Sequence, residues 1–159
     1  MTPPLLVLSD ALRRRIESEG AAAYPNECCG ILVGRDLGAG GAGERRRVVD
    51  RLEPGTNVFE TDEQYHRFSI DPRQQMKAER AAEAEGKVVL GFYHSHPDHP
   101  ARPSEYDREH GWPFYSYVIV AIAKGKPVDM TSWVLDDKTN QFVAQAIVAA
   151  DGKPDGTRD

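Results

Sequence analysis

Two stretches of the chain repeat their apolar residues at the spacing of one helix face. Over residues 9–23 the apolar positions suit a single buried face, and Ser9 is placed to cap the start of the helix. A second helix is predicted from the capping residue Asp71 through an alanine- and glutamate-rich segment that ends near Glu85. Pro72 would occupy the first helical position, where no N–H is needed. We therefore expect two main helices.

Shorter apolar runs before, between and after these helices predict the strands. They lie at residues 5–8, 27–35, 48–52, 88–96, 115–123, 128–135 and 142–149, with a short extended piece at 66–70. The glycine-rich residues 38–43 predict a flexible turn, because they lack the Lys-Ser or Lys-Thr ending and the following helix of a phosphate-binding loop. This order of elements predicts an α+β fold whose sheet is largely antiparallel or mixed.

The size of the chain limits how many domains it can form. Its 159 residues, 40% hydrophobic and 28% charged, suit one well-packed core and are too few for two ordinary domains. We predict a single domain over residues 1–150 and a disordered tail at residues 151–159. No apolar run approaches the roughly eighteen residues of a membrane span, and the first residues lack a signal-peptide pattern. A cytoplasmic protein without membrane contact is expected.

Charge and cysteine usage exclude further classes of function. The formal net charge is −5, and the short basic run Arg45-Arg46-Arg47 is expected on a solvated strand. We therefore expect no nucleic-acid partner. Cys28 and Cys29 are the only cysteines, and adjacent residues are poorly placed for an ordinary disulfide. A reducing compartment agrees with this usage.

Three of the five histidines, His94, His96 and His99, fall within six positions. His94 and His96 are two residues apart at the end of an apolar strand, so both side chains should point to the same face, about 6.6 Å apart along the backbone. Two imidazoles can then bind one zinc ion, which prefers four ligands in a tetrahedron. Because a catalytic zinc site uses three protein ligands and leaves one position for water, a third ligand is needed.

Asp107 is the best candidate for the third ligand, since Ser104-Glu105-Tyr106-Asp107 begins a short predicted helix after the loop. The same four residues also match a capping box, in which Ser104 and Asp107 would satisfy backbone groups for purely local reasons. Their position after His-x-His-Pro favours a metal site, because paired histidines are costly to bury unless they bind something. Asp98 and His99 are rivals that we expect at the rim of the site.

A hydrolytic zinc site also needs a base that is not a ligand, and here the sequence resembles a known family. Glu27, then His94-Ser95-His96-Pro97, and then Ser104-x-x-Asp107, with seven residues between His96 and Ser104, match the signature of the JAMM or MPN-type metalloproteases. The segment around Glu27 also resembles the glutamate-bearing strand of compact prokaryotic members. The resemblance reaches from about residue 5 to residue 149.

The resemblance implies an α/β sandwich similar to the cytidine deaminase core, with one zinc ion at a strand end. It implies that His94, His96 and Asp107 hold the zinc ion. Glu27 would accept a proton from the attacking water and deliver it to the leaving amine. Ser104 would hydrogen-bond the oxyanion or orient the water. No thiol nucleophile is needed, so we expect the cysteines to serve packing.

The implied substrate is a peptide or isopeptide bond at the carboxyl end of a ubiquitin-like protein, in particular a sulfur carrier that ends in Gly-Gly. Two alternatives stand beside this hypothesis. A zinc deaminase would need a Pro-Cys-x-x-Cys ligand pair, which the sequence lacks. A non-catalytic scaffold of the same fold would bind partners without metal. Residues 57–68 could line the substrate groove or form a packed connection.

Overall fold

The computed structural model describes residues 2–38, 44–57 and 70–149. Its elements, in chain order, are β1 (Leu5–Val7), α1 (Asp10–Ala23), β2 (Cys29–Leu37), β3 (Arg46–Gly55), α2 (Pro72–Ala84), β4 (Val88–Pro97), α3 (Glu105–His110), β5 (Ser116–Ala123), β6 (Lys126–Asp136), β7 (Gln141–Gln145) and β8 (Ile147–Val148). Most of the predicted glycine-rich turn at 38–43, most of the extended piece at 66–70, most of the segment 57–68 and the tail 151–159 lie outside the described residues.

Local capping signals place the two main helices as predicted. The Ser9 hydroxyl accepts the Leu12 N–H at 3.2 Å and begins α1. The Asp71 carboxylate accepts the Arg73 N–H at 2.9 Å, and Pro72 is the first residue of α2. None of the helices in the described part of the chain is long and apolar enough to cross a membrane.

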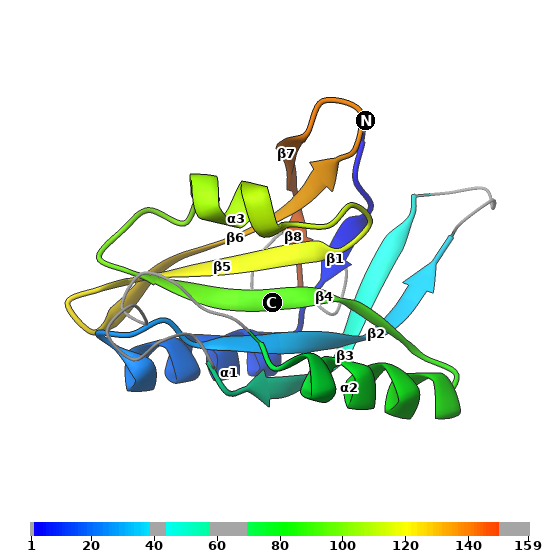
Figure 1. Ribbon diagram of the computed structural model, residues 1–159, viewed down its shortest axis with the longest axis horizontal. Coiled ribbons are helices and arrows are strands. Elements are labelled where there is room, and N and C mark those ends of the chain that lie inside the picture. Colours follow the sequence, from blue (N-terminus) through cyan, green and yellow to red (C-terminus); the bar gives the residue numbers. More distant parts are fainter. Residues whose placement is uncertain (1, 39–43, 58–69, 150–159) are drawn as a thin grey trace.

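The strands form one sheet of eight in the order β7-β6-β5-β4-β2-β3-β1-β8 (Figure 1). Strand β1 is parallel to β3 and β8, and β4 is parallel to β5, while the other pairs are antiparallel. The predicted α+β fold with a mixed sheet and two main helices is therefore confirmed. Strand β4, which carries the histidines, lies between β2 and β5 in the middle of the sheet.

Helices pack on both faces of this sheet. Successive residues of a strand point to opposite faces, and on β4 they enter different cores. Tyr93 packs with Ile16 of α1, whereas Phe92 packs with Ala78 and Ala82 of α2. The site described below therefore lies on the α2 face of β4, with the α1 core directly behind it.

The last predicted strand, at residues 142–149, is wrong as a single element. The chain breaks at Ala146, so that β7 pairs with β6 at one edge of the sheet and β8 pairs with β1 at the other. Because one residue separates β7 from β8, the two edges must curl toward each other. Gln145 joins them, since its amide oxygen accepts the Ser132 hydroxyl at 2.7 Å and its amide nitrogen donates to the Pro4 carbonyl at 2.9 Å. Such pairing depends on sheet curvature, which a run of apolar residues does not encode.

The basic run is only partly on the surface. Arg45 and Arg46 are exposed as expected, but Arg47 is buried. Its Nη1 donates to the Ser116 hydroxyl at 2.9 Å, and its Nε lies 3.6 Å from a carboxylate oxygen of Asp36. The expectation of three solvated arginines is wrong for Arg47 because the curled sheet brings Ser116 of β5 within its reach.

Candidate metal centre

The end of β4 brings two imidazoles together on one face of the sheet. His94 and His96 are separated by one residue, and both are buried, with 1% and 6% of their surface exposed. Their Nε2 atoms lie 3.1 Å apart. The predicted placement of both side chains on one face is therefore confirmed. Strand β4 is paired with β5 along both residues, whereas its pairing with β2 ends at His94.

The first turn of α3 brings a carboxylate to the same point. Oδ2 of Asp107 lies 3.1 Å from Nε2 of His96 and 3.4 Å from Nε2 of His94. Asp107 is also part of a complete capping box: its Oδ2 accepts the Ser104 N–H at 2.8 Å, and its own N–H donates to the Ser104 hydroxyl at 3.1 Å. The capping box is therefore present, and it is compatible with the metal-site interpretation because the cap aims the Asp107 carboxylate at the histidines.

The mutual distances of these three atoms test whether the group fits a metal ion. Ligand atoms bound to a tetrahedral zinc ion at about 2.0–2.1 Å lie roughly 3.3–3.4 Å from one another. Here the three separations are 3.1, 3.1 and 3.4 Å. Within residues 2–38, 44–57 and 70–149, His94, His96 and Asp107 are the one group of three or more metal-ligating side chains that converges in this way. The donor set and its spacing fit zinc.

The protonation states of the group also suit a cation. Burial lowers the pKa of His94, which keeps its imidazole neutral near pH 7. Burial by itself would raise the pKa of Asp107, but the two histidines and the Ser104 N–H outweigh it and hold the pKa well below its usual range. Burial by itself would lower the pKa of His96, but Asp107 and the Pro100 carbonyl outweigh it and raise the pKa. Nδ1 of His96 lies 2.9 Å from the Pro100 carbonyl, so the neutral ring carries its proton there and leaves the Nε2 lone pair facing the site.

Glu27 lies two residues before the start of β2, near the histidines. Cys29 is paired with His94, and one step further the Ser95 N–H donates to the Cys28 carbonyl at 3.2 Å. Continuing this antiparallel register places Glu27 opposite His96, on the same face of the sheet. Glu27 is buried, and this burial raises the pKa of its carboxyl to about 8; the nearby His96 lowers the pKa, and Asp107 raises it. Sheet pairing thus joins Glu27 to a motif that lies far along the chain.

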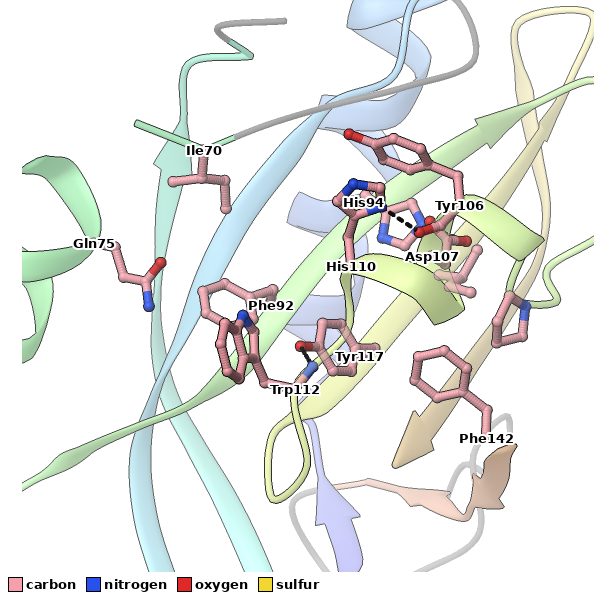
Figure 2. A pocket seen from close by; sticks show the side chains of 12 residues that line it. Ile70, Gln75, Phe92, His94, Tyr106, Asp107, His110, Trp112, Tyr117 and Phe142 are labelled. Carbon is pink, nitrogen blue, oxygen red and sulfur yellow. Dashed lines mark hydrogen bonds and ion pairs between the residues drawn. The ribbon is translucent and has the colours of Figure 1, made fainter. Parts of the chain in front are cut away.

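Two cavities flank the group. One of about 640 Å³ is lined by Glu27, His96, His99 and Ser104, among others. The other, of about 240 Å³, is largely apolar (Figure 2). Besides Tyr106 of α3, an aromatic wall of Phe92, Trp112, Tyr117 and Phe142 lines this cavity, as Figure 2 shows. Sequence reasoning missed this aromatic wall, because its residues come from β4, β5, β7 and the loop after α3, and no spacing rule connects them.

The remaining candidates fall outside the converging group. His99 is exposed on the rim of the larger cavity. Asp98 accepts the Tyr24 hydroxyl at 2.6 Å and the Lys124 N–H at 2.8 Å, so it anchors the loop that follows β4. Cys28 and Cys29 are free thiols, and burial raises their pKa values to about 11 and about 12. Both therefore stay protonated near pH 7, which agrees with packing rather than nucleophilic chemistry.

Fold and site together define a class of protein: an α+β domain with a His-His-Asp group at the end of its central strand and a buried glutamate beside it. The chain belongs to the family of prokaryotic homologs of the JAB domain, whose model matches residues 9–136. The predicted family resemblance is thereby confirmed.

Individual proteins resemble the chain over much of its length. A desampylase from Haloferax volcanii is 38% identical over 124 residues, which cover 75% of this chain and 82% of that protein. A probable TtuB-protein conjugate cleaving protease from Thermus thermophilus is 41% identical over 68 residues, covering 42% of this chain and 45% of that protein. A solution structure of a protein from Desulfitobacterium hafniense superposes with a TM-score of 0.75 at 32% identity, covering 91% and 92% of the two chains.

Proposed function

We propose that the protein is a zinc metallopeptidase that hydrolyses a peptide or isopeptide bond at the carboxyl end of a ubiquitin-like sulfur-carrier protein. The observation that carries the proposal is the group of three ligand atoms separated by 3.1, 3.1 and 3.4 Å. Glu27 and Ser104 line one cavity directly beside this group. A base, an oxyanion donor and a metal site would thus face one space.

The ligands in this proposal are His94, His96 and Asp107. A zinc ion bound to two neutral imidazoles and one carboxylate would keep a net charge of about +1, and it would supply Lewis-acid activation of water and of the scissile carbonyl. The chain supplies the remaining chemistry. Glu27, whose burial makes it a stronger base, takes a proton from the attacking water and gives it to the leaving amine.

Ser104 is arranged to stabilise the oxyanion. Its hydroxyl oxygen already accepts the Asp107 N–H at 3.1 Å, so the hydroxyl proton is available to donate. The side chain is exposed to the cavity that Glu27 also lines. A donor held in place before the reaction stabilises the charge that develops on the carbonyl oxygen.

The proposed substrate class draws on the relatives. One is named a desampylase, and another is named for cleaving TtuB-protein conjugates. We extend to this chain the hydrolysis of conjugates of a ubiquitin-like protein. Reduced thiols and a net charge of −5 agree with a cytoplasmic enzyme that acts on protein rather than on nucleic acid.

The test is mass spectrometry of ubiquitin-like carriers that bear carboxyl-terminal extensions or lysine-linked proteins, after incubation with the zinc-loaded protein. We expect cleavage after the carrier's terminal glycine. The matched control is Glu27→Gln, which keeps the size of the side chain and should lower kcat about 10²- to 10⁴-fold while zinc stays bound. Asp107→Asn should instead lower the zinc content itself.

Two results would overturn the proposal. The first is full cleavage by Glu27→Gln. The second concerns protein purified without chelator. If it contains no zinc, binds the carriers and cleaves none of them, the protein is a non-catalytic scaffold.

A further inference from the structure

Ser95 stands between the two histidines of β4 and points away from them. Its neighbours His94 and His96 face the candidate site, so the Ser95 side chain faces α1 on the other side of the sheet. Ser95 is fully buried. A Cβ built on Gly20 of α1 would lie 3.3 Å from the Ser95 Cβ, so the helix covers this position closely. Ser95 therefore touches neither cavity and cannot contact substrate there.

The Ser95 hydroxyl makes an unusual tie to the segment that carries Glu27. In a regular antiparallel pair, Ser95 and Cys28 would exchange two bonds between backbone groups. One is present, from the Ser95 N–H to the Cys28 carbonyl at 3.2 Å. The other is replaced, because the Cys28 N–H donates to the Ser95 hydroxyl oxygen at 2.8 Å. The side chain thus extends the pairing of β2 with β4 beyond Cys29, where β2 formally begins.

This tie acts one peptide unit from Glu27. The Cys28 N–H belongs to the peptide group that Glu27 begins, so the bond to Ser95 restrains the backbone that directs the Glu27 side chain. A weaker contact holds the same peptide group from the other side, where the Asn57 amide donates to the Glu27 carbonyl at 3.3 Å. Glu27 itself is outside the regular strand pairing, since β2 starts two residues later along the chain.

We propose that Ser95 is a positioning residue that holds Glu27 opposite His96 for catalysis; this inference rests on the proposed function. The hydroxyl acts through the backbone of Cys28 rather than on the substrate. When it is removed, a partly buried N–H loses its acceptor and the segment before β2 can move. A displacement of about 1 Å of a reacting group can cost on the order of 10²-fold in rate.

The experiment measures steady-state cleavage of an extended ubiquitin-like carrier, together with zinc content, for Ser95→Ala, Glu27→Gln and the double variant. We expect Ser95→Ala to lower kcat about 10- to 100-fold with KM within about 2-fold and the zinc content unchanged. In protein that already carries Glu27→Gln, adding Ser95→Ala should change kcat by less than about 2-fold. If the Ser95 hydroxyl acts by positioning Glu27, its removal has little further effect once that carboxylate is gone.

Ser132→Ala is the matched control. Ser132 is another buried serine of the sheet, and its hydroxyl donates to Gln145, remote from Glu27 along the chain and in the sheet. It should lower the melting temperature about as much as Ser95→Ala while kcat stays within about 2-fold of wild type. If Ser95→Ala does not fold, Asn57→Ala tests the same idea at the carbonyl of the same peptide group, with an expected loss of about 3- to 10-fold in kcat that also disappears in Glu27→Gln.

The inference is overturned if Ser95→Ala keeps its full kcat, if it loses zinc, or if its loss is equally large in the Glu27→Gln background. Each of these outcomes leaves the proposed function standing. Failure of the proposed function appears separately, as unchanged cleavage by Glu27→Gln alone.

Discussion

Burial of Glu27 predicts that the metal-free protein becomes less stable as pH rises. Burial raises the pKa of this carboxyl from its ordinary 4.5 to about 8 in the folded state. Between these values the folded chain keeps a proton that the unfolded chain has lost, so the stability present below about pH 4.5 falls until about pH 8. A pKa difference of one corresponds to about 1.4 kcal/mol, which makes the expected loss about 4 kcal/mol between about pH 5 and pH 8.5.

Glu27→Gln isolates this effect, because glutamine resembles the protonated carboxyl and does not titrate. We would measure urea unfolding of both proteins with chelator across this pH range and take the difference in free energy of unfolding, in which the contributions of other groups cancel. The variant should gain about 4 kcal/mol relative to wild type toward high pH. Added zinc should shrink the gain, because a nearby dication favours the carboxylate. A difference that stays within about 1 kcal/mol at every pH would refute the reasoning.

Three further predictions follow from single contacts. Ser104→Ala removes both the cap of α3 and the proposed oxyanion donor, so it should cost about 1 kcal/mol in urea unfolding and about 10²-fold in kcat, whereas Ser104→Thr should restore both in part. Gly30→Ala should destabilise by about 3 kcal/mol or more, because its Cβ would lie 2.0 Å from Cζ of Tyr93; the added substitution Tyr93→Leu should recover part of the loss. Iodoacetamide at neutral pH should modify Cys28 and Cys29 far more slowly than free cysteine and leave cleavage intact, since their pKa values are raised to about 11 and about 12; fast labelling in the folded protein would contradict the burial argument.

Features that depend on neighbours in sequence were predictable. The Ser9 and Asp71 caps join residues two or three positions apart, and so does the capping box of Ser104 and Asp107. The common face of His94 and His96 follows from strand alternation alone. The sequence pattern also named Glu27 in advance, but only through the resemblance, because nothing in its local surroundings distinguishes it from an exposed glutamate.

Features that depend on long-range pairing were not predictable. The break at Ala146, the burial of Arg47 and the aromatic wall of the smaller cavity all follow from the curl and strand order of the sheet. The hydroxyl of Ser95 accepts the N–H of Cys28, 67 positions away along the chain. Ser95 lies between the two histidines of the motif, and the motif pattern assigns it no role.

The sequence by itself therefore determined most of the elements and their caps, because these depend on residue type and on spacing within one or two turns, and its motif named the residues of the candidate site. Only the tertiary structure decided that one atom each of His94, His96 and Asp107 converge at zinc spacing, that Glu27 is buried opposite His96, and that the Ser95 hydroxyl bonds the Cys28 N–H. The physical reason is that these distances are set by the register between β2 and β4 and by the docking of α3. Packing across the whole sheet selects both.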